Sequence, residues 1–126
     1  MKGFRMYTKT DAPQIIIAAG NKPKKIEEYV GRVATDNQQV SIARMISPGG
    51  WIEPAQIPEF DEYSIVLRGE LHARIDDGET IILKAGQAIS LKAGAKVQYS
   101  TPGEEGAEYI SVCMPAFGPD TVHRQE

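Results

Sequence analysis

Several features that define common protein classes are missing from this sequence, and each absence narrows what the chain does. Cys113 is the only cysteine among 126 residues, which excludes an internal disulfide and is typical of the reducing cytoplasm. No apolar run approaches the roughly 20 residues that a membrane-spanning helix needs. Residues 1–10, MKGFRMYTKT, contain no apolar core, so we expect no signal peptide.

A strong charge of one sign is missing as well. The formal net charge is −3, and basic residues are scattered apart from Lys22, Lys24 and Lys25. We therefore expect no basic face for nucleic acid or for an anionic membrane. What remains is 41% hydrophobic and 25% charged residues, the composition of an ordinary soluble globular protein. At this length, residues 1–126 are expected to form one domain.

Short segments with a period of two dominate the chain from residue 40 onward. Apolar and polar residues alternate over 40–46 and 71–75, and further short runs follow up to Met114. Turn residues separate these runs, and Asp76-Asp77-Gly78 predicts a tight hairpin turn. Evenly spaced short strands of this kind predict an all-β sandwich or barrel. We expect the tail beyond Phe117, which is polar, to lie on the surface.

The first 31 residues suggest one strand and one helix. Three consecutive isoleucines within 14–19 favour a strand that is buried on both sides or covered by a partner subunit. Pro23, an apolar face and a terminal Gly31 predict one short helix over 23–30. The isoleucines, together with outward-facing Ile65 and Leu67, are more apolar surface than a small monomer leaves in water, which predicts a homodimer.

Two glycine-anchored patterns resemble the two motifs of the cupin family. The first is Gly50-x5-Gln56-x-Pro58-x3-Glu62-x6-Gly69, where cupins have G-x5-H-x-H-x3-E-x6-G. The second is Gly86-x5-Lys92-x-Gly94-x2-Val97-x3-Thr101, where cupins have G-x5-P-x-G-x2-H-x3-N. The resemblance implies an antiparallel double-stranded β-helix, the jelly-roll barrel of cupins, with a core over about 38–117 and one short N-terminal helix.

The metal ligands of a typical cupin are replaced at three of four positions. A cupin centre would use three imidazoles and one carboxylate, but here the positions hold Gln56, Pro58, Glu62 and Val97. Proline and valine offer no side-chain donor atom, and two oxygen ligands do not select a transition metal without help. Tyr99 shares the strand face of Val97 and offers a phenolate. We expect no metal and no other cofactor.

Glu62 is the strongest candidate for a functional residue. Strand alternation places Glu62, Ser64 and Val66 on one face, which the cupin resemblance turns toward the barrel interior. A carboxylate there either accepts hydrogen bonds, for which Gln56 and Tyr99 are the candidates, or becomes protonated. We expect desolvation to raise its pKa. Glu62 is then either a catalytic acid or base, or a ligand anchor, or a satisfied structural carboxylate.

Other residues are weaker candidates. Trp51 either stacks on a ligand at the barrel mouth or packs in the core or at a subunit contact. Glu53 is expected to be a solvated loop acid, although a second rim carboxylate is the alternative. Arg44 is expected at the surface, although an ion pair with Glu62 is conceivable. Cys113 is expected to be a core thiol, and the two histidines, His72 and His123, are expected to be partly exposed and solvated, respectively.

Three functions fit these residues. The leading one is a metal-independent cupin that binds or senses a small molecule through Gln56, Glu62, Tyr99 and Trp51. The second is an isomerase or lyase that uses Glu62 as base and Tyr99 as acid. The third is an accessory cupin with a filled barrel. The Q-type cupins of ethanolamine utilisation are similar in lacking the histidine set. The run Glu62–Gly69 and Tyr99 of this sequence also resemble the corresponding residues of those proteins.

Overall fold

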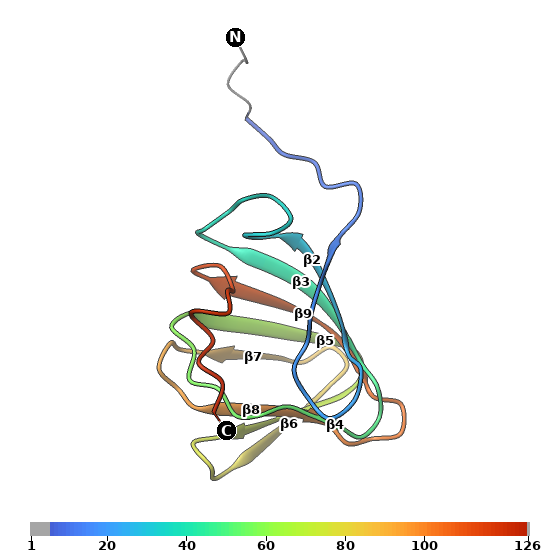
Figure 1. Ribbon diagram of the computed structural model, residues 1–126. Coiled ribbons are helices and arrows are strands. Elements are labelled where there is room, and N and C mark those ends of the chain that lie inside the picture. The colour runs from blue at the N-terminus through green and yellow to red at the C-terminus, as the bar shows by residue number, and fades with distance from the viewer. Residues whose placement is uncertain (1–5, 126) are drawn as a thin grey trace.

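Nine antiparallel strands form the regular structure of residues 6–125, which are the residues that the computed structural model describes (Figure 1). That part of the chain contains no helix. The strands are β1 (Gln14–Ile16), β2 (Lys25–Val30), β3 (Ser41–Ser47), β4 (Trp51–Ile52), β5 (Asp61–Ile75), β6 (Thr80–Lys84), β7 (Ala88–Leu91), β8 (Val97–Thr101) and β9 (Ala107–Met114). The all-β antiparallel architecture is as expected.

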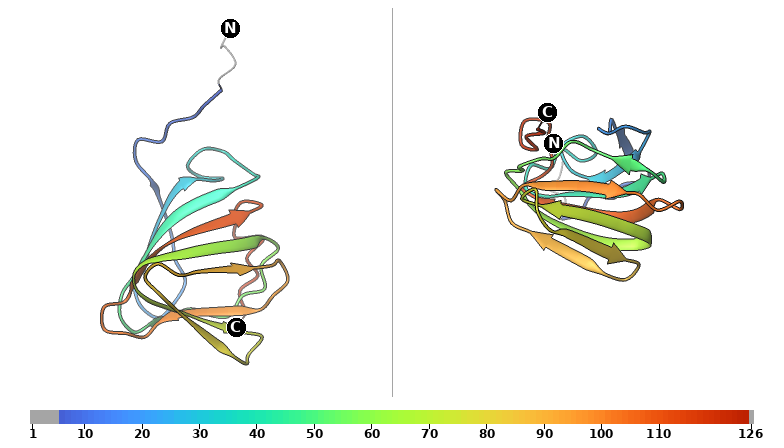
Figure 2. Two further views of the ribbon diagram at one scale, coloured as in Figure 1. Left: turned by 180° about the vertical axis from the view of Figure 1, so that it is seen from behind. Right: turned by 90° about the horizontal axis from the view of Figure 1, so that it is seen from below.

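The strands form one curved sheet with the order β1-β2-β3-β9-β5-β8-β4, and β6 and β7 also pair with β5. Figure 2 shows from two further sides how the strands bend around a common interior. The long strand β5 makes this curvature possible, because its first half pairs with β9 and β7 and its second half with β8 and β6. One strand therefore connects both walls of the barrel.

Gly69 lies where β5 passes from one wall to the other. Its φ is +76°, a conformation that residues with a side chain rarely adopt. A Cβ atom at this position would lie 2.0 Å from the carbonyl oxygen of Gly106. Because backbone fills that space, glycine is required here, and the last glycine of the first sequence motif marks the bend of the barrel.

Alternation along β5 separates the interior from the outer face as predicted. Glu62, Ser64 and Val66 are buried, whereas Tyr63 and Ile65 are 42% and 44% exposed. The interior side packs into a core that also holds residues of β4, β6, β8 and β9. Its members are Trp51, Val66, Leu71, Ala73, Leu83, Val97, Tyr99, Ala107 and Tyr109. The hairpin turn at Asp76–Gly78 is also confirmed, since Asp76 and Asp77 have positive φ and the amide of Gly78 donates to Ile75.

The predicted helix over 23–30 is wrong, because this segment is strand β2. It pairs with β1 on one side and with β3 on the other, so tertiary hydrogen bonds replace those of a helix. Ile26, Glu27 and Glu28 are all buried. Glu28 then accepts hydrogen bonds from the amides of Val33 and Ala34, and its carboxyl fills the space beside Gly31. Gly31 does end a regular element, as predicted, but that element is strand β2 and not a helix.

The expected N-terminal strand is confirmed over Gln14–Ile16 only. Burial on both sides is wrong within one chain, because Ile15 and Ile17 are 60% and 93% exposed. The chain before β1 extends away from the barrel (Figure 1). Residues 1–5 lie outside the described residues, and the expectation of no signal peptide, which rests on residues 1–10, stays a prediction. No helix among residues 6–125 is long and apolar enough to cross a membrane.

The C-terminal tail is more structural than its polarity predicts. Its backbone pairs with the segment between β4 and β5, through Ile57 with His123, Glu59 with Thr121, and Gln125 with Ala55. Val122 is 2% exposed and packs with Phe60 and Cys113. The expectation that the tail simply lies on the surface is therefore wrong, because hydrogen bonds and one apolar anchor fix it against the barrel.

Candidate functional site

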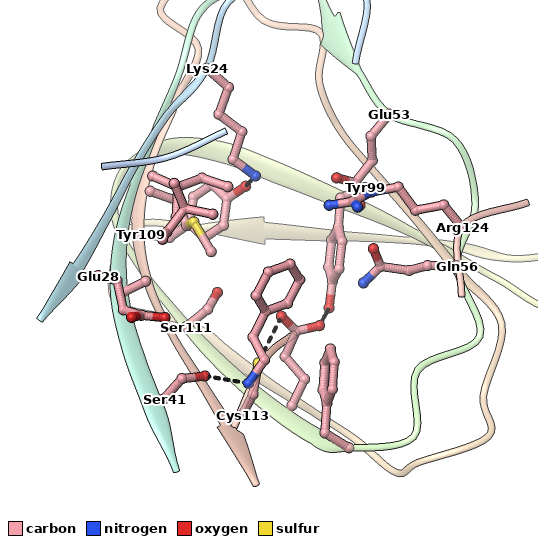
Figure 3. Close-up of a pocket in the computed structure, with 17 residues that line it drawn as sticks. Lys24, Glu28, Ser41, Glu53, Gln56, Tyr99, Tyr109, Ser111, Cys113 and Arg124 are labelled. Carbon is pink, nitrogen blue, oxygen red and sulfur yellow. Dashed lines mark hydrogen bonds between the residues drawn. The ribbon is translucent and has the colours of Figure 1, made fainter. Parts of the chain in front are cut away.

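A cavity of about 50 Å³ lies inside the barrel between β2, β3, β8 and β9 (Figure 3). A buried water needs about 10–15 Å³, so the cavity has room for about four waters or for a molecule of about four non-hydrogen atoms. The barrel is thus not completely filled. Its polar lining residues are Lys24, Glu28, Ser41, Glu53, Gln56, Glu62, Tyr99, Tyr109, Ser111, Cys113 and Arg124.

Glu62 lies in the wall of this cavity and is 7% exposed. Its Oε1 accepts a 2.8 Å hydrogen bond from the hydroxyl of Tyr99, and its Oε2 accepts from the Cys113 thiol at 3.7 Å. Burial raises the pKa of Glu62, and the bond from Tyr99, the charge of Lys24 and the Cys113 contact oppose that shift only in part. The direction agrees with the expectation, but the expected second donor, Gln56, is replaced by Cys113.

Gln56 and Glu53 also turn their side chains into the cavity (Figure 3). Backbone bonds between Gln56 and Val97, and from the amide of Glu53 to Tyr99, hold their segment against β8. The two side chains are 5% and 7% exposed, yet no group of residues 6–125 hydrogen-bonds to either of them. Such groups normally have partners when buried. Both polar ends are therefore free to bind something in the cavity.

The expectation that Glu53 is a solvated loop acid is wrong. The β4–β5 connection folds inward because it pairs with β8, which brings Glu53 into the interior. Burial raises the pKa of Glu53 to about 7, and the charge of Glu62 adds to the rise, whereas Lys24 and Arg124 oppose it. The cavity consequently holds a carboxyl that changes its charge near neutral pH.

Lys24 is a site residue that the sequence reasoning missed. Its ammonium donates a 2.8 Å hydrogen bond to the hydroxyl of Tyr109 and lies 4.1 Å from the ring centre of Trp51. Burial lowers the pKa of Lys24, but Tyr109 and Glu53 outweigh it, so the pKa lies above its usual value and the amine is charged. A strand assignment for this segment would have shown the signal, since Lys24, Ile26 and Glu28 share one strand face.

Arg124 was also missed, because it belongs to the polar tail. The tail carries its guanidinium to the cavity, 5.9 Å from the ring centre of Phe117. Its Nε is buried and has no hydrogen-bond partner. The local sequence gives no sign of this, because the position of Arg124 depends on how the tail pairs with residues 55–59.

The structure does not bring Trp51 to the cavity wall. Its ring is fully buried in the core and its Nε1 donates to the carbonyl of Ala19. Trp51 instead contacts Lys24, because the ammonium of Lys24 lies over its ring in a cation–π interaction. This agrees with the core alternative that its sequence position allowed.

The remaining candidates lie outside the polar centre, except for Cys113. Arg44 is on the outer face and pairs with Glu108 and Glu27, so the conceivable ion pair with Glu62 does not form. His72 contacts Glu70, and His123 contacts Glu59 on the outside of the tail. Burial raises the pKa of the Cys113 thiol, which therefore stays protonated.

The residues present do not fit the metal centre of a typical cupin. Among residues 6–125, no group of three or more histidine, cysteine, aspartate or glutamate side chains is arranged to hold a metal ion. Pro58 and Val97, which stand at two of the usual ligand positions, are buried and have no donor atoms. Glu62 and Tyr99 are bonded to each other. We derive no chemistry from a metal.

The chain is similar in sequence to two known proteins. An alignment with the endoribonuclease YbeY of Myxococcus xanthus covers 102 residues, which is 81% of this chain, at 44% identity. An alignment with the acetate kinase EutQ of Salmonella typhimurium covers 57 residues, which is 45% of this chain, at 39% identity. The chain covers 34% of the length of the first protein and 24% of the second.

Solved structures show the same fold. A putative ethanolamine utilisation protein Q from Salmonella typhimurium superposes with a TM-score of 0.65 at 22% identity, over 83% of this chain and 97% of that one. A predicted oxalate decarboxylase from Thermotoga maritima superposes with a TM-score of 0.69 at 20% identity, over 87% and 99%. The sequence pattern of the cupin domain matches residues 44–113, which hold both glycine motifs and most of the barrel. This chain therefore belongs to the cupin domain family.

Proposed function

We propose that this cupin binds a small organic molecule in its barrel cavity without the help of a metal ion. The observation that carries the proposal is the pair Glu53 and Gln56, largely buried residues that line the cavity and whose side chains form no hydrogen bond among residues 6–125. A buried polar group without a partner costs about 1–3 kcal/mol, which a bound ligand offsets. Glu62 with Tyr99 would form the fixed polar end of the same site.

The activities of the sequence relatives do not carry over to this chain, because it covers only 34% and 24% of their lengths. The resemblance to EutQ covers under half of this chain and about a quarter of EutQ, so its kinase activity is not proposed here. The endoribonuclease activity of the first relative is not proposed either, because this chain covers only 34% of that protein and its net charge of −3 does not favour RNA binding. We propose an accessory role resembling that of EutQ-type cupins, in a cytoplasmic homodimer.

A thermal-shift screen tests the proposal directly. Small acids, amides, alcohols and amines would be added to the protein, and at least one is expected to raise its melting temperature. Ala43→Leu, which adds bulk to the cavity wall, should remove the response. Ala88→Leu, on the exposed side of β7, adds the same bulk outside and should keep it. A wild-type protein that responds to none of these compounds would contradict the proposal.

An enzyme remains the second candidate because Glu62 is a buried carboxyl 2.8 Å from the Tyr99 hydroxyl. Burial raises the pKa of Glu62, and a carboxyl with a raised pKa is a better proton donor at neutral pH than an ordinary one. Tyr99 itself is a poor acid, since burial and the neighbouring Glu62 raise its pKa well above the usual value. Glu62→Gln keeps the shape, so it should stop turnover of a bound compound while the compound still binds. Binding with no turnover in the wild type would exclude this candidate.

A further inference from the structure

The cavity contains two cations that no carboxylate neutralises by direct contact. Lys24 and Arg124 take part in none of the ion pairs formed among residues 6–125. The Lys24 ammonium bonds to a neutral phenol, Tyr109, and the Nε of Arg124 is buried without a partner. Buried charges in proteins are normally paired, because losing water without a counter-charge is costly.

The carboxyls of the same cavity form no ion pair with either cation, and burial favours the neutral form of two of them. Glu53 has a pKa of about 7, and burial raises the pKa of Glu62 as well. Glu28 is held by the amides of Val33 and Ala34, so its Oε2 is occupied. Burial raises the pKa of Tyr99, Tyr109 and Cys113, which keeps all three neutral. Glu53 is therefore a lining group whose charge changes near neutral pH.

We propose that the cavity binds a small monocarboxylate between Lys24 and Arg124, with the Glu53 carboxyl protonated and donating a hydrogen bond to it. The proposal rests on the proposed function and names its ligand class. A planar guanidinium and an ammonium match the two oxygens of a carboxylate, and the free amide of Gln56 provides one more donor. The volume of about 50 Å³ limits the ligand to roughly the size of acetate.

Anion binding at this site takes up a proton. With Glu53 ionised, its charge offsets one of the two positive charges and repels a second anion, whereas protonated Glu53 leaves both cations without that counter-charge. Affinity is therefore highest below the pKa of about 7 and falls as the pH rises through it. About one-tenth of Glu53 is protonated at pH 8, so acetate should bind about tenfold more weakly at pH 8 than at pH 6.

Trp51 supplies a reporter for this test. It is the only tryptophan of the chain, and the Lys24 ammonium lies 4.1 Å from its ring centre. Fluorescence of the full chain would be titrated with acetate, acetamide and ethylammonium, which are similar in size and differ in charge. We expect a saturable change with acetate, a much weaker one with acetamide and none with ethylammonium. Calorimetry in two buffers of different ionisation enthalpy should show about one proton taken up per acetate at pH 8.

Three substitutions test whether acetate binds at Lys24, Arg124 and Glu53. Lys24→Gln and Arg124→Gln should each weaken acetate binding at least tenfold, measured by calorimetry because the first also changes the surroundings of Trp51. Glu53→Gln removes the titrating group, so its acetate affinity should be equal at pH 6 and pH 8. Lys25→Gln, a change at the neighbouring exposed lysine, is the control for loss of a positive charge outside the cavity. Circular dichroism confirms that each variant is folded.

The outcomes separate this inference from the proposed function. Equal affinity for acetate and acetamide, or preference for ethylammonium, overturns the anion site and leaves a small-molecule cavity. A pH dependence that persists in Glu53→Gln and disappears in Glu62→Gln overturns the role of Glu53. If acetate does not bind while another compound gives a thermal shift that Ala43→Leu removes, only this inference fails.

Discussion

The hydroxyl of Tyr99 donates a 2.8 Å hydrogen bond to the carboxyl of Glu62, and both side chains are at least nine-tenths buried. The two residues come from β8 and the first half of β5, which do not pair there, so the bond crosses the barrel interior. It stabilises the ionised form of a carboxyl that burial otherwise drives toward the neutral form.

Removing this hydroxyl should destabilise the protein in a pH-dependent way. Tyr99→Phe leaves Glu62 with the Cys113 thiol as its donor, so the pKa of Glu62 rises further. We expect a loss of about 1–2 kcal/mol in the free energy of unfolding at pH 8 and a smaller loss at acidic pH, where more of the carboxyl is protonated. Urea unfolding at both pH values measures this. Tyr63→Phe, on the outer face of β5, should change neither value.

Stability should fall as the pH rises from about 4.5 to 7. Glu53 has a raised pKa in the folded protein, so the folded state binds more protons than the unfolded state in this range. The stabilising protonated form is present below the unfolded value of 4.5 and is lost as the pH passes about 7. The pKa shift of Glu53 corresponds to a change of up to about 3 kcal/mol in the free energy of unfolding. Glu53→Gln should flatten the profile, and an unchanged slope in that variant would show that another group is responsible.

Gly69→Ala should be strongly destabilising. The added Cβ meets the carbonyl of Gly106 at 2.0 Å, and φ at this position is +76°. Backbone has to move, and we expect a loss of about 3 kcal/mol or more in the free energy of unfolding. Gly103→Ala is the matched control, because a Cβ there meets nothing within 4 Å. Comparable losses in the two variants would argue against a steric requirement at the bend.

We expect a homodimer in solution. Ile15 and Ile17 near the edge strand β1, and Ile65 and Leu67 on the outer face of β5, are between 44% and 93% exposed in the single chain. Surface of this kind is normally covered. Sedimentation at tens of micromolar should give the mass of two chains, and Ile65→Glu or Ile15→Glu should shift it toward one. A monomeric wild type would contradict the prediction.

Purified protein should contain no stoichiometric transition metal. The reason is the donor set, since Pro58 and Val97 provide no ligand atom and Glu62 is bonded to Tyr99. Elemental analysis should give far less than one zinc, iron, nickel or manganese per chain, and a chelator should leave the melting temperature unchanged. About one metal per chain would contradict this and point to Glu62 with Gln56 or Tyr99 as its ligands.

The interior position of Glu62 beside Tyr99 followed from the sequence because alternation in a strand is a local property. The cupin resemblance indicated which face is inside, and its motif glycines mark turns whose positive φ only glycine adopts easily, as at Gly50, Gly69, Gly86 and Gly94. The barrel and its first polar pair therefore needed no tertiary information beyond the cupin spacing.

Tertiary structure decided the rest of the site. Residues 25–30 have local helix signals, but pairing with β3 makes them a strand and turns Lys24 inward. Glu53 becomes buried because its segment pairs with β8, and Arg124 because the tail pairs with residues 55–59. Each of these positions depends on a hydrogen-bond partner far away in the sequence, and local patterns of charge and polarity do not encode such partners. The sequence alone therefore determined the barrel and the Glu62–Tyr99 pair, whereas long-range strand pairing decided which charges face them.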